Sequence, residues 1–408
     1  MRVLLSAVGT RGDVQPALAL ALELRKLGHS VRLCISPNFV SWAASLGLDA
    51  APMGVEMRAP TRASGPPPKL SPEEMRKLLA SMPDLVTDQF DTLGRAAEGC
   101  DVIVGCNAHQ YAAPSIAERW HIGCVTAVYA PVAIPSPDFA PPPSPGVVLD
   151  AAAPIEDQWR AVAKAWNERS LERVNHNRAR LGLKPIADVL DYALGRDTWL
   201  AADPTLAPPP TAPRRRIFQT GAWLLPDTSP LPAELEAFLE RGSPPIYVGF
   251  GSMPAASDAA RPLLAAARAA GRRTVVSKGW AELDAVDAPD SIAVDDVNNH
   301  ALFPRVAAVV HHGGAGTTAA AARAGAPQLV TPLFGDQFYW ASRVVELGVG
   351  ATVPHAAMAE EPLTRALRQL LDPAVTPVAR ALAARVAARN GAELAARRLE
   401  ADYDGDDL

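Results

Sequence analysis

The stretch that decides the fold of this chain lies at residues 311–318 and reads His311-His312-Gly313-Gly314-Ala315-Gly316-Thr317-Thr318. An apolar run at residues 306–310 precedes it, and the alanine-rich residues 319–324 follow it. This order predicts a buried strand, a tight turn and a helix. Glycine lets the backbone approach a ligand closely, and the free N–H groups and dipole at a helix start favour an anion. We therefore interpret the stretch as a phosphate-binding turn.

The turn differs from two other nucleotide-binding patterns. It lacks the Gly-Lys-Ser/Thr of a Walker A loop and the Gly-x-Gly-x-x-Gly of a dinucleotide fingerprint. A nicotinamide-dependent oxidoreductase is therefore disfavoured. A turn that only connects a strand to a helix is the alternative to a phosphate site.

The bulk composition indicates a globular protein of two domains. The chain has 408 residues, 49% of them hydrophobic, and a formal net charge of −5. No run of about 18 uncharged apolar residues is present, so the sequence predicts no transmembrane segment. The negative charge gives no electrostatic reason to bind nucleic acid. The four cysteines have no metal-type spacing, and we expect them to be buried thiols of a cytoplasmic protein.

The N-terminal half alternates predicted strands and helices. Residues 3–8 form an apolar strand candidate, and not a signal peptide, since they run into the polar residues 9–13. A helix is expected from Pro16 to Gly28, and a second strand at residues 31–35. Further segments that continue the alternation are residues 43–46, 101–106, 116–120 and 124–128. This βαβ pattern predicts a parallel sheet.

Proline-rich stretches divide the chain. Those at residues 54–72 and 131–145 are long loops of the kind that often act as lids. A helix is expected from Ile155 to about Leu181, and the stretch at residues 202–213 is expected to join two domains.

The alternation restarts at residues 246–250. The expected elements that follow are a helix near residues 258–270, strands at residues 274–277, 306–310 and 328–331, a helix at residues 379–399 and a frayed acidic tail at residues 401–408. The predicted fold class is α/β, with two doubly wound, Rossmann-like domains facing a cleft. The predicted parts are an N-terminal domain (residues 1–205), a linker (206–222), a C-terminal domain (223–378), and a C-terminal helix and tail (379–408) whose helix packs back on the N-terminal domain.

Three motifs stand in a fixed order along the chain. They are Gly9-Thr10-Arg11-Gly12-Asp13-Val14-Gln15-Pro16, the stretch at residues 311–318, and Phe334-Gly335-Asp336-Gln337. Together they resemble the bacterial branch of the family 1 glycosyltransferases, that of the sterol, macrolide and glycopeptide-antibiotic enzymes. Residues 219–223 and 247–252 are similar to the glycopeptide-type members. The resemblance covers nearly the whole chain and is weakest in the two proline-rich loops.

The resemblance implies a GT-B fold and a metal-independent, inverting transfer. A hexose would pass from a UDP- or dTDP-sugar to a hydroxyl of a lipophilic natural product such as a polyketide or macrolide, a glycopeptide aglycone or a sterol-like acceptor. It implies no cofactor and no metal ion, and we expect a monomer or a weak dimer. Uracil and thymine stay open alternatives for the base.

The resemblance also implies roles for individual residues. Asp13 takes the position of the general base, and a helix-capping role is the alternative. His312 matches the histidine that contacts the diphosphate, and a packed histidine is the alternative. Additional diphosphate donors are expected from Gly314, Gly316, Thr317 and Ser252.

Other candidate residues surround the sugar, the base and the acceptor. Asp336 and Gln337 match a pair that binds sugar hydroxyls, and a plain helix start is the alternative. Trp280 is a candidate for the base pocket or for the core, and Val297 marks the segment whose backbone would recognise the base. Acceptor candidates chosen by position alone are Gln15, His109, Gln110 and Phe139, and a structural role is the alternative for His109. An apolar groove is a further candidate, with core packing as the alternative for most of its residues, which are Met53, Met57, Met75, Met82 and Phe90.

Two other functional classes fit parts of the sequence. A catalytically silent GT-B homologue that serves as a partner subunit is disfavoured by four intact residues, namely Asp13, His312, Asp336 and Gln337. A GT-B sugar-nucleotide epimerase would have no use for long acceptor loops. Asp402-Tyr403-Asp404 copies a metal-binding Asp-x-Asp motif, but no strand precedes it, and a solvated tail is the favoured interpretation.

Overall fold

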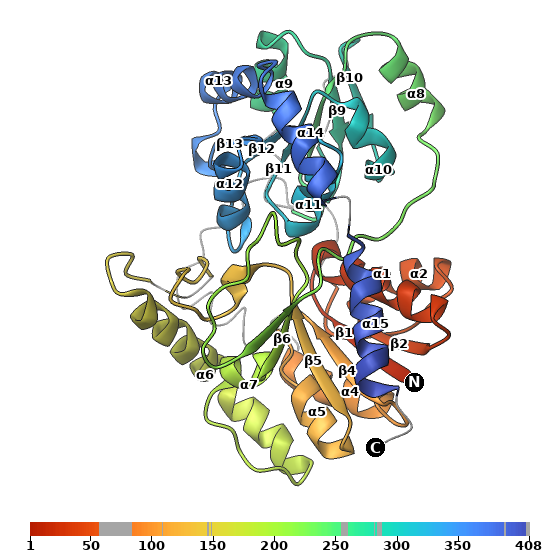
Figure 1. Cartoon of the computed structure of the whole chain (residues 1–408), viewed down its shortest axis with the longest axis vertical. Helices are drawn as coiled ribbons and strands as arrows, with labels where there is room; N and C mark the ends of the chain where they lie inside the picture. The colour runs from red at the N-terminus through yellow and green to blue at the C-terminus, as the bar shows by residue number, and fades with distance from the viewer. Residues whose placement is uncertain are drawn as a thin grey trace.

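The computed structural model of the chain describes residues 1–56, 84–107, 109–144, 147, 149–253, 260–280, 282–283, 288–386 and 389–404. Two α/β domains lie end to end, and the C-terminal helix returns to the N-terminal domain (Figure 1). Each domain has one parallel sheet with helices on both faces. The predicted fold class of two Rossmann-like domains is therefore confirmed.

The N-terminal domain has a seven-stranded sheet in the order β3-β2-β1-β4-β5-β6-β7. Its strands are β1 (Arg2–Ala7), β2 (Ser30–Ile35), β3 (Asp49–Pro52), β4 (Val102–Cys106), β5 (Gly123–Val128), β6 (Asp197–Leu200) and β7 (Arg216–Gln219). The helices on one face are α1 (Arg11–Lys26), α2 (Val40–Ser45) and α15 (Gly391–Tyr403), and on the other face α4 (Leu85–Ala96), α5 (Ala113–Trp120), α6 (Ile155–Arg180) and α7 (Val189–Leu194). Val3 and Leu5 pack toward α1 and Leu4 toward α4, as the two-residue period of a strand requires.

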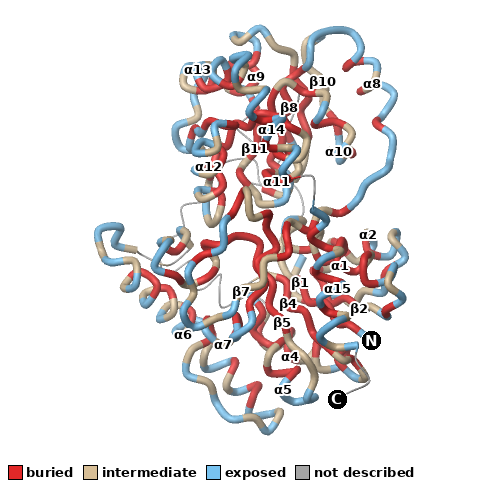
Figure 2. Tube along the Cα trace, viewed as in Figure 1, coloured by how far each residue is buried: buried red, intermediate tan, exposed pale blue. Residues whose placement is uncertain are grey.

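The C-terminal domain has a six-stranded sheet in the order β10-β9-β8-β11-β12-β13. Its strands are β8 (Ile246–Gly249), β9 (Thr274–Ser277), β10 (Ser291–Val294), β11 (Ala308–His311), β12 (Gln328–Val330) and β13 (Gly350–Thr352). Its helices are α8 (Ala233–Glu240), α9 (Ala260–Ala269), α10 (Asn299–Leu302), α11 (Ala315–Arg323), α12 (Gln337–Glu346), α13 (Glu360–Leu370) and α14 (Val375–Val386). Buried residues follow the strands of both sheets (Figure 2).

The strand order reverses at one point in each sheet. In the first sheet the reversal lies between β1 and β4, and in the second it lies between β8 and β11. Connections leave such a pair of strands toward opposite faces, so a crevice opens at their carboxyl ends. The fold therefore offers one ligand crevice at the ends of β1 and β4 and another at the ends of β8 and β11.

The structure corrects the predicted linker and C-terminus. The predicted linker at residues 206–222 contains β7, an edge strand that pairs with β6 and whose arginine-rich start hid its apolar signal. The helix predicted at residues 379–399 is two helices, α14 and α15, because Asn390 caps a new helix start. The tail predicted to fray remains helical to Tyr403, whose ring lies where a side chain on Gly123 would stand.

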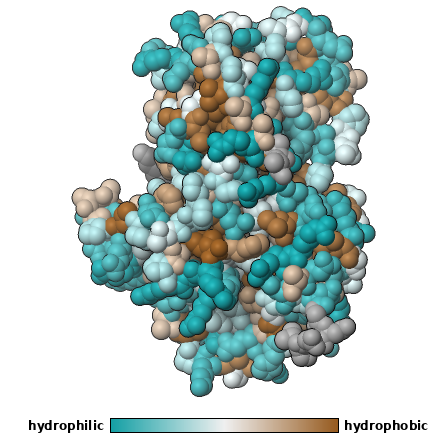
Figure 3. Space-filling model, viewed as in Figure 1, coloured by the Kyte–Doolittle hydropathy of each residue, from teal (hydrophilic) through white to brown (hydrophobic). Residues whose placement is uncertain are grey.

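The surface, the helices and the cysteine thiols can be compared with what the composition predicts. Hydrophilic and hydrophobic residues mix on the face that Figure 3 shows. Among the described residues, no helix combines the length and apolar character needed to cross a membrane. Cys34, Cys100 and Cys106 are buried free thiols, as predicted, and Cys124 is half-buried.

Gly391 should be required for the docking of α15. A Cβ atom on this residue would lie 2.3 Å from the backbone carbonyl carbon and oxygen of Gly221. We expect Gly391→Ala to lower the free energy of unfolding by about 1–3 kcal/mol, as overpacking does elsewhere, in a urea titration. Arg397→Ala, an exposed change on the same helix, should lower it by less than about 0.5 kcal/mol. Equal effects of the two changes would contradict this packing argument.

Candidate active site

Asp13 lies in the first turn of α1, just beyond the carboxyl end of β1. Thr10 is the N-cap of this helix, and the Oδ2 atom of Asp13 accepts hydrogen bonds from the Thr10 backbone N–H (2.8 Å) and hydroxyl (3.2 Å). The capping alternative is thus observed, with Asp13 as the third helical residue and not as the N-cap. Burial raises the pKa of Asp13 above its ordinary value, and these hydrogen bonds oppose the rise.

Two neighbours fix the Asp13 carboxylate. Asn107, directly after β4, donates its side-chain amide to Oδ1 of Asp13, and its φ of 72° lies in the left-handed region. Gly9 has a φ of 141°, and a Cβ atom there would lie 2.1 Å from Oδ2 of Asp13. The sequence analysis missed Asn107, although a polar residue directly after a fully apolar strand is a usable signal.

His109 lies on the same side of the cleft as Asp13. Its ring stacks on Trp166 with centroids 5.1 Å apart. His109 is an exposed residue, yet desolvation by the surrounding protein lowers its pKa, and the Asp13 carboxylate opposes that shift. The predicted acceptor role of His109 stays a prediction that this position suits.

The remaining acceptor candidates lie in different environments. Gln110 is 1% exposed; its Oε1 accepts from Ser6 and its Nε2 donates to the Cys106 carbonyl, so its amide is held inside the domain, and its acceptor role stays a prediction. Gln15 is half-buried and accepts from Arg11. Met53 and Phe90 belong to the core, whereas Met57, Met75 and Met82 lie outside the described residues.

The glycine-rich turn joins β11 to α11 as the sequence predicted. His311 is fully buried; its Nδ1 accepts from the Gly313 backbone N–H (3.1 Å) and its Nε2 lies 3.0 Å from Oε1 of Gln328. Burial lowers the pKa of His311 to about 3, so the ring is neutral and supports the turn. Gly313 has a φ of 95°, and a side chain there would collide with Val330.

His312 stands at the start of α11 with a free ring nitrogen. Its Nδ1 is buried and has no hydrogen-bond partner among the described residues. Its Nε2 lies 2.6 Å from where a Cβ atom on Gly314 would stand, so only glycine fits beside the ring. Burial lowers the pKa of His312 to about 4, which leaves the imidazole neutral at pH 7.

The helix start beside His312 is uncapped. Gly314 is the N-cap residue of α11 and has no side chain to accept the first N–H groups. Gly316 is exposed, and a Cβ atom on it would meet no described neighbour within 4 Å, while Thr317 is half-buried. Gly251 and the half-buried Ser252 follow β8, where a side chain on Gly251 would contact the His312 ring at 3.8 Å. An anion placed here would meet donors from both strands of the second crevice.

Asp336 and Gln337 follow β12, but their side chains differ in hydrogen bonding and exposure. Asp336 accepts a hydrogen bond from Trp340 Nε1 at 3.0 Å and does not cap α12 with its side chain. Gln337 is 4% exposed, and its Oε1 accepts from the backbone N–H groups of Leu333 and Phe334. Gln337 therefore shapes the loop, and Asp336 is the better placed of the two to contact a sugar.

Asp13 and Asp336 come from different domains, and the charge of Asp13 reaches Asp336. Burial raises the pKa of Asp336 to about 6, and the negative charge of Asp13 adds to the rise. The two carboxyl groups thus sense each other although they come from different domains. That Asp13 as the base and Asp336 as a sugar ligand share one site stays a prediction, which this electrostatic interaction suits.

The proline-rich loop at residues 131–145 reaches the C-terminal domain beside Asp336. The Pro143 carbonyl accepts from the Gly335 backbone N–H at 3.1 Å, and the Phe139 ring lies edge-on to Tyr339 with centroids 5.5 Å apart. Phe139 is thus placed at the domain junction, and its acceptor role stays a prediction that this position suits.

The two base-pocket candidates lie near the opposite side of the junction. Trp280 follows β9, and its backbone N–H donates to the Gly251 carbonyl at 2.9 Å. Its ring stacks on Phe39 of the N-terminal domain, with centroids 6.0 Å apart. Val297 is half-buried in the segment between β10 and α10.

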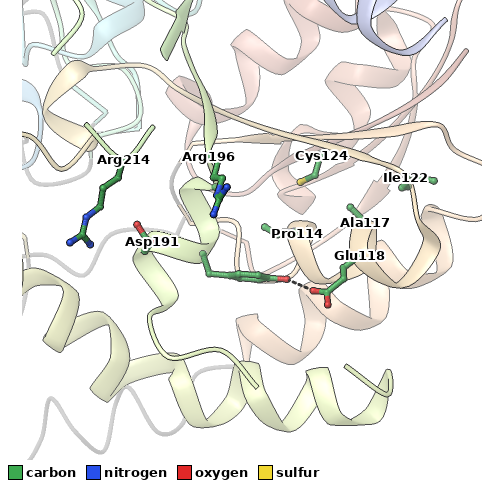
Figure 4. Close-up of a pocket in the computed structure, with 10 residues that line it drawn as sticks. Pro114, Ala117, Glu118, Ile122, Cys124, Asp191, Arg196 and Arg214 are labelled. Carbon is green, nitrogen blue, oxygen red and sulfur yellow. Dashed lines mark hydrogen bonds between the residues drawn. The ribbon is translucent and has the colours of Figure 1, made fainter. Parts of the chain in front are cut away.

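A cavity of about 780 Å³ lies away from these residues. Glu118, Arg196 and Arg214 are among its lining residues (Figure 4). Tyr192 also lines it and donates a hydrogen bond to Glu118. It opens at the amino ends of β5 and β6, the edge opposite to the cleft. No predicted site residue lines it, so the chemistry assigned to the cleft does not use it.

The described acidic residues offer a metal-like cluster only away from the cleft. His29, Glu400 and Asp404 have ligand-type atoms close together, but Asp404 already accepts from the Met1 ammonium at 2.8 Å. Asp402 pairs with Arg398. The residues of Asp402-Tyr403-Asp404 are therefore used in holding the end of α15.

The sequence was compared with known families and proteins. Residues 3–125 match the N-terminal domain of glycosyltransferase family 28, and residues 265–401 match the C-terminal domain of the erythromycin biosynthesis protein CIII-like family. The vancomycin aglycone glucosyltransferase of Amycolatopsis orientalis is 41% identical over 402 residues, covering 98% of this chain and 97% of that protein. The dTDP-epi-vancosaminyltransferase of the same organism is 40% identical over 399 residues, covering 95% and 93%.

A solved structure shares the fold. The glycosyltransferase of kitacinnamycin superposes with a TM-score of 0.74 at 19% identity, covering 98% of this chain and 99% of that one. With sequence relatives this similar over nearly the full length, the chain is a glycosyltransferase. It belongs to the bacterial GT-B glycosyltransferases of the sterol, macrolide and glycopeptide-antibiotic branch.

Proposed function

We propose that this protein transfers a hexose from a UDP- or dTDP-sugar to a hydroxyl group of a lipophilic natural product, with inversion and without a metal ion. The observation that supports the proposal is the uncapped start of α11 beside His312, whose buried Nδ1 has no hydrogen-bond partner among the described residues. A base, a sugar ligand and a diphosphate site are the three parts that such a transfer needs.

The proposed reaction moves one proton, forms one bond at the anomeric carbon and breaks another. The Asp13 carboxylate takes the proton of the acceptor hydroxyl, whose oxygen attacks the anomeric carbon from the face opposite the diphosphate. The bond between the anomeric carbon and the diphosphate oxygen breaks, and the nucleoside diphosphate leaves. A carboxylate is a weak base, so it accepts the proton late, when the attacking hydroxyl has become acidic.

The leaving diphosphate would be stabilised by neutral donors. The first N–H groups of α11 and a neutral His312 are the donors we propose for the diphosphate, because the helix start is uncapped and the His312 ring carries no charge at pH 7. Gly314, Gly316, Thr317 and Ser252 are the proposed further donors. Such donors can stabilise the negative charge on the phosphate oxygens, as a metal ion does in other enzymes. This supports the proposal of metal-independent transfer.

The acceptor class is inferred from relatives and loops. The relatives named above include a glucosyltransferase for the vancomycin aglycone. In this chain the loop at residues 131–145 brings Phe139 and several prolines to the domain junction, which suits a large, partly apolar acceptor.

Donor binding is the first test of the proposal. With EDTA present, UDP-glucose or dTDP-glucose should bind saturably to the purified protein in titration calorimetry. His312→Ala should weaken that binding about 10- to 100-fold, because a hydrogen bond to a charged group is lost. His312→Gln keeps a neutral side-chain donor and should lose less. Binding that requires a divalent metal, or that His312→Ala leaves unchanged, would contradict the proposed diphosphate site.

Asp13→Asn separates the two roles of Asp13. An asparagine keeps an oxygen that can accept from the Thr10 N–H, but it cannot take a proton. We expect kcat for transfer to a glycopeptide aglycone, followed by mass spectrometry, to fall about 10²- to 10⁴-fold. Donor affinity should persist. If turnover is retained, Asp13 caps the helix and does not act as the base.

Asn107 should set the pH dependence of the reaction. Its hydrogen bond lowers the pKa of Asp13, so its loss should raise that pKa further. A base works only when deprotonated, so the acid limb of the kcat/KM profile should move to higher pH in Asn107→Gly. Glycine accepts the φ of 72° without strain. An unshifted acid limb in a variant of normal stability would remove Asn107 from this role.

A further inference from the structure

Arg11 connects the two domains next to the proposed base. It is the first residue of α1, two positions before Asp13. Its Nη1 atom lies 2.7 Å from Oδ2 of Asp296 in the C-terminal domain. Its guanidinium also stands 4.9 Å from the centroid of the Trp42 ring, and its Nε donates to Gln15 at 3.3 Å. The Arg11 side chain is therefore held by its own domain while it pairs with the other.

Asp296 lies in the segment between β10 and α10. It is next to Val297, where the nucleobase of the donor is proposed to bind. The neighbouring Asp295 also forms an ion pair, with Lys278 at 3.1 Å, but that pair lies within the C-terminal domain. The side chains of Asp295 and Asp296 are similarly exposed, at 82% and 76%. Of these two ion pairs, the one made by Asp296 crosses between the domains.

A second contact lies on the same side of the junction. The rings of Phe39 and Trp280 are nearly parallel, 13° apart, and Phe39 is 7% exposed. Phe39 precedes α2, which carries Trp42, and Trp280 follows β9, the neighbour of β10. The ion pair thus sits beside a packed aromatic contact, which gives the two surfaces a defined register.

We propose that Arg11 and Asp296 are positioning residues that hold the nucleotide-binding segment against the helix turn of Asp13. The pair favours the domain arrangement in which the charge of Asp13 reaches Asp336. It also links the segment of Val297 to the helix turn that carries the general base, Asp13, two residues away from Arg11. An exposed ion pair is too weak to hold a fold together. It is sufficient to bias the balance between closed and open domain arrangements. This inference rests on the proposed function and adds two residues to it.

A double-mutant cycle tests the pairing. Asp296→Asn and Arg11→Gln should each lower kcat/KM for donor hydrolysis, with UDP-glucose or dTDP-glucose, by about two- to fivefold. The double variant should have a kcat/KM no lower than that of the less active single variant, because both changes remove the same contact. Asp295→Asn is the matched control and should retain wild-type kcat/KM. The melting temperature should be the same for Asp296→Asn and Asp295→Asn.

Small-angle X-ray scattering supplies a readout that does not depend on activity. Asp296→Asn should increase the radius of gyration of the ligand-free protein, and Asp295→Asn should not. Equal scattering and equal kinetics for these two variants, or additive losses in the double variant, would overturn the positioning role. A wild-type protein that binds neither donor would instead refute the proposed function, and the scattering comparison would still decide the pairing.

Discussion

The parallel direction of every strand in both sheets is the constraint on which the site depends. It brings the carboxyl ends of the strands in each domain to one edge, and the reversals of strand order open that edge between β1 and β4 and between β8 and β11. Asp13 and Asn107 follow the first pair of strands, and Ser252 and His312 follow the second. Residues far apart in the chain thereby lie at the carboxyl edges of the two sheets, and none of them lies in a regular strand.

The environment of Asp13 combines structural and chemical demands. The carboxylate closes the first turn of α1, and the same burial that makes its hydrogen bonds effective also raises its pKa. Gly9 gives it space and Asn107 fixes its other oxygen. A capping residue and a proton acceptor are therefore compatible at this position, since the two oxygens face different partners.

The domains touch on two sides of the paired carboxyl groups. On one side Arg11 and Phe39 meet Asp296 and Trp280, and on the other the loop at residues 131–145 meets the start of α12. Arg343 of α12 adds a hydrogen bond to the Leu206 carbonyl at 2.9 Å. The position of Asp13 relative to Asp336 thus depends on contacts at both margins of the cleft, most of them between side chains and loops.

The sequence by itself determined the fold class and the glycine-rich turn, because strand periodicity and glycine spacing are local. It singled out Asp13, His312 and Asp336 only through the resemblance to a family, and their roles stay predictions. It did not determine β7, the break before α15 or the environment of Gln110 and Gln337, because pairing, packing and buried hydrogen bonds depend on residues distant in the chain. Asn107 and the partnership of Arg11 with Asp296 were likewise decided only by the tertiary structure. Each is a contact between elements that no local pattern relates.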